Sequence, residues 1–87
     1  MNNRGCVKSI QRGTKDAFFL EHESSIRIDI ANVDLNKSIL ISDYDQSGGG
    51  SLIFNLLNNA IVIKNTNTDP TTKVWISGYT YQVVEFY

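Results

Sequence analysis

Cysteine and histidine are almost absent from this sequence. Its 87 residues include one cysteine, Cys6, and one histidine, His22. A single cysteine excludes an internal disulfide, and one cysteine with one histidine cannot form a zinc site of the Cys/His type. A domain this small is marginally stable by itself, and small domains are commonly stabilised by disulfides, metals or association. Association with other chains is therefore the expected source of stability.

An excess of positive charge is also missing. Eight Lys and Arg residues stand against nine Asp and Glu residues, which gives a formal net charge of −1 and a pI of about 5.6. This balance argues against nucleic acid as a partner, because phosphate backbones are bound by basic surfaces. Four basic residues near the start are interpreted as a solvated strand face; they are Arg4, Lys8, Arg12 and Lys15.

Long apolar segments are absent as well. No apolar run approaches the roughly 18 residues that a membrane-spanning helix requires. The opening residues MNNRGCVKSIQ contain no apolar core of a signal peptide. Membrane insertion and signal-directed export are therefore not expected. The protein is expected to stay in the cytoplasm that made it, or to be assembled there into a larger particle.

What the sequence does contain is alternation of apolar and polar residues with a period of two. In SIRIDIANV, Ile26, Ile28 and Ile30 alternate with polar or small residues. Further strand-like stretches are CVKSIQR, AFFLEHES, KSILISDY, LIFNLL, AIVIKN and KVWISGYTYQVVEFY. Gly13 is expected to end the first of them, and Gly78 to introduce a bulge or a bend into the last. Together they predict an all-β fold: one domain over residues 1–87, a small antiparallel β-sandwich of six to seven strands with no long helix.

Two polar stretches are predicted to be loops. Residues 43–51, DYDQSGGGS, are rich in glycine, and residues 65–72, NTNTDPTT, contain the only proline. Their side chains hydrogen-bond well to sugars and to proteins, so both stretches are candidate display loops. The residues concerned are Asp43, Asp45, Gln46, Ser47, Asn65, Asn67 and Asp69.

Catalytic and metal chemistry are not favoured by any motif. Asp43, Asp45 and Ser47 resemble the first half of a calcium-binding EF-hand loop, but Phe54 occupies the position of the bidentate Glu. His22 lies between two glutamates, yet three adjacent strand residues do not converge on one ion. No nucleophile elbow and no phosphate-binding loop are present. The sequence therefore predicts a protein that is not an enzyme and has no metal and no cofactor.

Aromatic residues concentrate in the last predicted strand. If that strand is regular after Gly78, Tyr79 and Tyr81 share one face with Val83, and Phe86 lies on the other. Aromatic rings fill cores, anchor subunit interfaces and stack on ligands, and all three roles stay open. The candidate core or interface anchors are Trp75, Tyr79, Tyr81, Val83, Phe86 and Tyr87.

Three segments resemble a family of small phage and prophage proteins. VKSIQRGT, IRIDIANVDLNKSILI and YQVVEFY are similar to the two ends and the middle strand pair of that family. The resemblance implies a non-enzymatic virion structural protein of the tail-fibre or tail-tip type. The YTYQVVEF ending is also similar to the last strand of the H-type lectin domain, a six-stranded sandwich that forms trimers and binds sugars. Tyr81 matches an aromatic residue of that strand, whereas the sugar-binding residues do not align and are not carried over.

Three functions follow as hypotheses. The first is a tail-associated or fibre-type virion protein that contributes to host attachment through its loops. The second is a capsid decoration protein that clamps neighbouring head subunits, and the least favoured is a small carbohydrate- or metal-dependent enzyme. The expected partners are further copies of the chain, as a homotrimer or a multiple of it, and other virion proteins. A host-surface glycan or protein is a further candidate partner, and the expected location is the virion.

Overall fold

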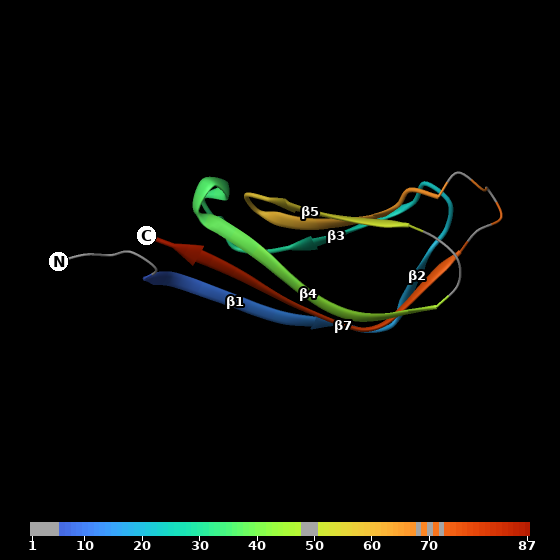
Figure 1. Ribbon diagram of the computed structural model, residues 1–87, viewed down its shortest axis with the longest axis horizontal. Helices are drawn as coiled ribbons and strands as arrows, with labels where there is room; N and C mark the ends of the chain where they lie inside the picture. The colour runs from blue at the N-terminus through green and yellow to red at the C-terminus, as the bar shows by residue number, and fades with distance from the viewer. Residues whose placement is uncertain (1–5, 48–50, 68, 70, 72) are drawn as a thin grey trace.

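A computed structural model describes residues 6–47, 51–67, 69, 71 and 73–87 of the chain. In these residues the chain forms seven β-strands and one 3₁₀ turn. They are β1 (Val7–Lys15), β2 (Phe18–Leu20), β3 (Ser25–Asp29), η1 (Leu35–Lys37), β4 (Ser38–Ser47), β5 (Leu52–Leu57), β6 (Ala60–Asn65) and β7 (Val74–Phe86). The strands form two antiparallel sheets, one above the other (Figure 1). The predicted all-β sandwich is confirmed.

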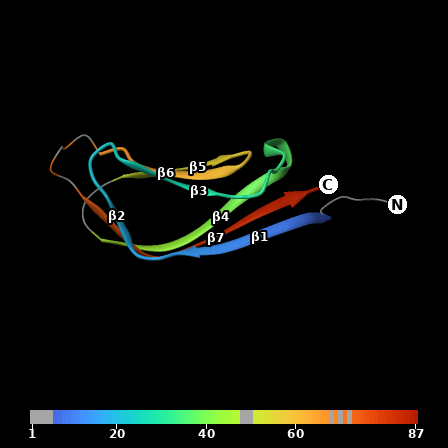
Figure 2. The ribbon, with the colours of Figure 1, turned by 180° about the vertical axis from the view of Figure 1, so that it is seen from behind.

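Sheet A is organised around β7. Strands β1 and β2 lie end to end along one side of β7, and β4 lies along the other side. Sheet B has the order β3-β6-β5, and the view from behind shows it covering one face of sheet A (Figure 2). The last strand of the chain is therefore central in its sheet.

The core lies between the two sheets and follows from the alternation in the sequence. In sheet B, Ile61, Ile63 and Asn65 of β6 are fully buried, while Lys64 between the last two is exposed. Sheet A contributes alternate residues of β7 in the same way. The buried apolar cluster consists of Leu20, Val33, Ile61, Ile63, Val74, Ile76, Tyr79 and Val83.

A bulge at Gly78 bends sheet A. On β4 the pairing passes from Asp43, opposite Thr80, to Asp45, opposite Ser77, so β7 carries one extra residue at this point. Gly78 has a φ of 67°, a left-handed conformation that glycine adopts without a steric penalty. Along β4 and β7, sheet A curves toward sheet B (Figure 1). The bulge predicted at Gly78 is confirmed.

Three local predictions were wrong. Gly13 does not end the first strand, because β1 continues to Lys15 through backbone pairing with β7. Residues 43–47 belong to β4 and not to a loop, because their backbone pairs with β7 as far as Trp75. Asn65 is the last residue of β6 and is fully buried, so it is not displayed.

The predicted loops also contain residues 48–50, 68, 70 and 72, which lie outside the described residues. Four of the candidate loop residues belong to β4 and are not loop residues. They are Asp43, Asp45, Gln46 and Ser47.

Gly13 provides space for an aromatic side chain of the neighbouring strand. It pairs with Tyr81, and a Cβ at Gly13 would lie 2.3 Å from the Tyr81 hydroxyl oxygen and 2.4 Å from Cζ. A contact this short does not occur between real atoms, so the ring or the strand would have to move. Glycine opposite an aromatic residue is thus a packing requirement of sheet A.

Gly13→Ala is expected to lower the free energy of unfolding by about 1–3 kcal/mol, the range for overpacking a close contact. Chemical unfolding would measure the change. Thr14→Ala, at the exposed neighbouring position, is the control and should be nearly neutral. In the presence of Tyr81→Leu, Gly13→Ala should lower the free energy of unfolding by less. Additive effects of the two substitutions on this free energy would contradict the contact.

Candidate functional site

The structure separates the predicted aromatic anchors into two groups. Tyr79 and Val83 are fully buried in the core, and Tyr81 is half-buried beside them. Trp75 and Tyr87 are 52% and 62% exposed, and Phe86 is half-buried on the opposite face of β7. The predicted face assignment for Tyr79, Tyr81, Val83 and Phe86 therefore agrees with the register of β7, whereas no single role covers the whole set.

Tyr79 is at the centre of an aromatic cluster between the sheets. Its ring centroid lies 5.8 Å from that of Phe54, 6.0 Å from that of Tyr81 and 6.4 Å from that of Tyr44. Its hydroxyl is 2.9 Å from the Ser42 hydroxyl. Burial raises the pKa of the Tyr79 hydroxyl above its ordinary value, the Ser42 hydrogen bond lowers it, and the nearby Tyr81 and Tyr44 raise it.

Asn65 fastens the segment that follows β6. Its Nδ2 donates a hydrogen bond to the Leu20 carbonyl at 3.0 Å, and its Oδ1 accepts one from the Asn67 amide at 2.9 Å. The same pattern continues along the chain, because Asn67 Oδ1 accepts from the Asp69 amide and Asp69 Oδ1 accepts from the Thr71 amide. Side chains of the predicted loop thus organise their own backbone.

The outer face of sheet A, turned away from sheet B, is the candidate functional site. It is crossed by rows of side chains that the register of β1, β7 and β4 brings side by side. The rows are Ile10–Val84–Ile39, Arg12–Gln82–Ile41 and Thr14–Thr80–Asp43, with Val7 beside Phe86 at the end. Within these rows Ile10, Ile39 and Ile41 are 41%, 49% and 47% exposed. Isoleucine side chains from both edge strands therefore face solvent on this side.

The opposite, inner face of the same strands carries polar side chains behind part of the apolar outer face. Glu85 is 6% exposed and accepts hydrogen bonds from the Asp34 amide at 2.9 Å and the Ser9 hydroxyl at 3.3 Å. Gln11 holds both backbone groups of Ala31, at 3.0 Å and 2.8 Å. These groups fasten the connection between β3 and β4 to sheet A. The usual orientation of a half-buried sheet is thus partly inverted here.

A shallow hollow of about 540 Å³ runs over β7 on the outer face. Thr80 and Gln82 of β7 lie between walls contributed by β1 and β4. Arg12 and Thr14 line the β1 side, and Ile41 and Asp43 line the β4 side. A guanidinium and a carboxylate thus stand on opposite edges of an otherwise apolar or uncharged surface.

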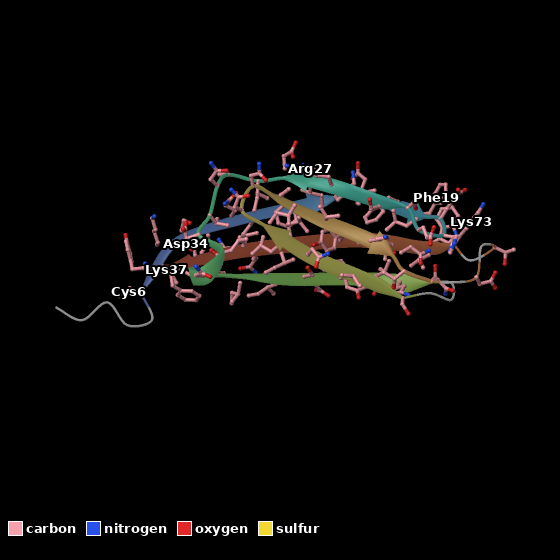
Figure 3. The ribbon with its side chains drawn as sticks, turned by 90° about the horizontal axis from the view of Figure 1, so that it is seen from above. Cys6, Phe19, Arg27, Asp34, Lys37 and Lys73 are labelled. Carbon is pink, nitrogen blue, oxygen red and sulfur yellow. The ribbon has the colours of Figure 1, made fainter. Side chains whose placement is uncertain are left out.

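A second exposed feature lies at the far end of sheet A. Phe19 of β2 and Trp75 of β7 are paired, and their ring centroids lie 4.9 Å apart. The Lys73 ammonium lies 5.7 Å from the Phe19 ring centre. Phe19 and Lys73 lie together at the end of the molecule opposite Cys6 and Asp34 (Figure 3). The two rings form a small exposed aromatic surface.

No metal-binding cluster is found within the described ranges, where no group of three His, Cys, Asp or Glu side chains is close enough to hold an ion. His22 lies in the turn after β2, with Nδ1 against the Asn67 carbonyl. Its other ring nitrogen is 3.8 Å from the exposed Glu23 carboxylate. Nor does any helix in the described part of the chain have the length and apolar character to cross a membrane.

Comparisons with family models, with curated proteins and with solved structures gave no significant match to this chain. The outer face of sheet A was missed in the sequence because alternation gives two sets of residues without saying which set is buried. One signal was available. In KSILIS, Ile39 and Ile41 form one set of alternating side chains, and Ser38, Leu40 and Ser42 form the other. The pattern showed that Ile39 and Ile41 share a face, but it did not show whether that face is buried or exposed.

Stability is expected to decrease at alkaline pH because of Tyr79. The folded pKa is raised above the unfolded value of about 10, so the stabilisation is complete below pH 10 and is lost as the pH rises further. The melting temperature, measured from pH 8 to 12, should fall more steeply for the unchanged protein than for Tyr79→Phe. Tyr87→Phe, at an exposed position, should follow the unchanged protein; parallel curves for all three would contradict the assignment.

Proposed function

We propose that this chain is a non-enzymatic structural subunit of a bacteriophage virion, held in the particle by the outer face of sheet A. The observation that carries the proposal is the apolar surface shared by β1, β7 and β4. Val7, Ile10, Ile39 and Ile41 are all 41–49% exposed there, while polar groups of the same strands are turned inward. Contiguous exposed apolar surface of this kind is typical of a contact with another protein.

The energetics favour a covered surface. Removal of apolar surface from water contributes about 25 cal/mol per Å², so a row of half-exposed isoleucines gives a sizeable gain when a partner covers it. A small domain without an internal disulfide benefits most from such a gain, because binding to the folded state stabilises that state. The proposed subunit is thus stabilised by its neighbours in the particle, and a homotrimer or a multiple of it stays the predicted assembly.

The tail position and the phage origin rest on the resemblance of three segments to tail-fibre and tail-tip proteins. A capsid decoration protein would use the same apolar face to clamp head subunits. Particles that carry an epitope-tagged copy of the chain, examined with gold-labelled antibody, distinguish the two locations. Label at the tail supports the proposal, label on the head assigns the decoration role, and absence of the chain from purified particles overturns both.

The double change Ile39→Thr and Ile41→Thr should reduce incorporation into particles roughly tenfold or more, because two half-buried contacts are lost. Threonine keeps the strand preference, so the isolated protein should melt within a few degrees of the unchanged one. Ile53→Thr is the matched control, since Ile53 is 46% exposed on β5 of sheet B. Equal incorporation of the double variant and the control would contradict the assigned face.

Host attachment is assigned to the aromatic end of sheet A. Trp75 and Phe19 offer exposed rings of the kind that stack on sugars and anchor protein contacts. Trp75→Ala should lower adsorption of assembled particles to host cells several-fold while incorporation stays unchanged. Tyr87→Ala, exposed at the opposite end of β7, is the control. Unchanged adsorption for Trp75→Ala would remove the attachment role and leave the structural one.

A further inference from the structure

We infer that the partner on the outer face of sheet A is a second copy of the chain. The two copies pack face to face and are related by a two-fold axis that is parallel to β7 and lies between the two faces, called below the axis along β7. This inference rests on the proposed function and specifies the first contact of the assembly, which under a two-fold axis is a multiple of the predicted trimer and not a single trimer. In the pair, β1 of each copy lies over β4 of the other. The side chains that meet are then Ile10 with Ile39, and Arg12 with Asp43.

The shape of the face fits such an axis. The hollow of about 540 Å³ lies over Thr80 and Gln82 of β7, and residues of β1 and β4 line it on either side. A two-fold axis parallel to β7 and between the two faces brings the β1 side of one copy against the β4 side of the other. Two-fold contacts are self-complementary, so each wall must match the other wall of the same chain.

The apolar residues meet that requirement. Ile10 on β1 and Ile39 on β4 lie in the same row, on either side of Val84. Rotation about β7 exchanges the two edges while each row keeps its level. Ile10 of one copy therefore faces Ile39 of the other, and the contact occurs twice. Val84, which is 8% exposed, lies between the two contacts.

The charges select the orientation. Arg12 lies on β1 and Asp43 on β4, one row apart, which corresponds to about 6.8 Å along a strand. Neither side chain has an ion pair with any residue that the structure describes. Under the two-fold axis along β7, each Arg12 comes within reach of the partner's Asp43. Two complementary ion pairs then close the two sides of the hollow.

The alternative orientation lacks this match. A two-fold axis across the strands places β1 over β1 and β4 over β4. Arg12 then meets only β1 of the other copy, which has no acidic residue, and Asp43 meets only β4. Arg12 and Asp43 then stay on opposite edges of the pair. Near the axis, each Arg12 faces the other Arg12 or each Asp43 faces the other Asp43. Charge complementarity therefore favours the axis along β7.

Cross-linking with single cysteines tests the orientation. In a Cys6→Ser background, Ile10→Cys and Ile39→Cys are prepared as separate proteins and treated with a short bismaleimide. The axis along β7 predicts cross-linked dimers when the two proteins are mixed and few in either protein alone. Dimers within the Ile10→Cys protein alone would assign the axis across the strands. No cross-link in any mixture, at concentrations where the unchanged protein sediments as a dimer, would overturn the face-to-face contact.

Charge reversal tests the ion pairs. Arg12→Asp and Asp43→Arg should each weaken self-association roughly tenfold or more in sedimentation experiments, because each change affects two symmetric contacts. The double reversal should restore it. Lys64→Asp, exposed on sheet B, is the control. The pairing would be contradicted if the single reversals left self-association unchanged, or if the double variant associated no more strongly than either single variant.

The outcomes separate this inference from the proposed function. A monomer in solution, whose incorporation into particles still depends on Ile39 and Ile41, would retain the virion role and overturn the self-pairing. A dimer with the expected cross-links that is absent from particles would retain the pairing and overturn the virion role. A trimer without any two-fold contact would likewise overturn the pairing.

Discussion

The pairing of β7 on both sides is the constraint on which the rest of sheet A depends. Strands β1, β2 and β4 pair with β7 and not with one another. The alternation of β7 therefore decides which side chains of all four strands face sheet B. The inward side chains of β7 are buried under sheet B, and Val84 on its outer face is buried between Ile10 and Ile39, which accounts for the apolar character of the closing segment. Its apolar residues divide between the core and the outer face.

The bulge at Gly78 modifies this constraint at one point. Ile76 and Tyr79 are both fully buried although they are three residues apart, which a regular strand does not allow. The extra residue at Gly78 shifts the alternation so that both side chains point toward sheet B. The bend separates two surfaces of sheet A: the apolar rows of the outer face on one side and the Phe19–Trp75 pair on the other.

In the part of sheet A that carries the apolar rows, the polar side chains of the inner face and the apolar side chains of the outer face have a common origin. The segment between β3 and β4 crosses the inner face there, and its backbone amides and carbonyls need partners away from water. Glu85 and Gln11 supply them through hydrogen bonds to Asp34 and Ala31. The inward positions that meet this segment are therefore polar, and the alternation places isoleucines outward. An apolar face left by such an arrangement is a surface for a neighbouring subunit in the proposed assembly.

Local pattern in the sequence determined the strand content, the sandwich and the bulge at Gly78, because period-two alternation and a glycine within a strand act over a few residues. The shared face of Tyr79, Tyr81 and Val83 followed from the same pattern, whereas the burial of Tyr79 did not, because core, interface and ligand roles were all compatible with it. Only the tertiary structure decided that residues 43–47 extend β4, since the backbone of β7 supplies their hydrogen bonds whatever their side chains are. It also decided that Ile39 and Ile41 face outward, because alternation defines two faces and the position of the other sheet chooses between them.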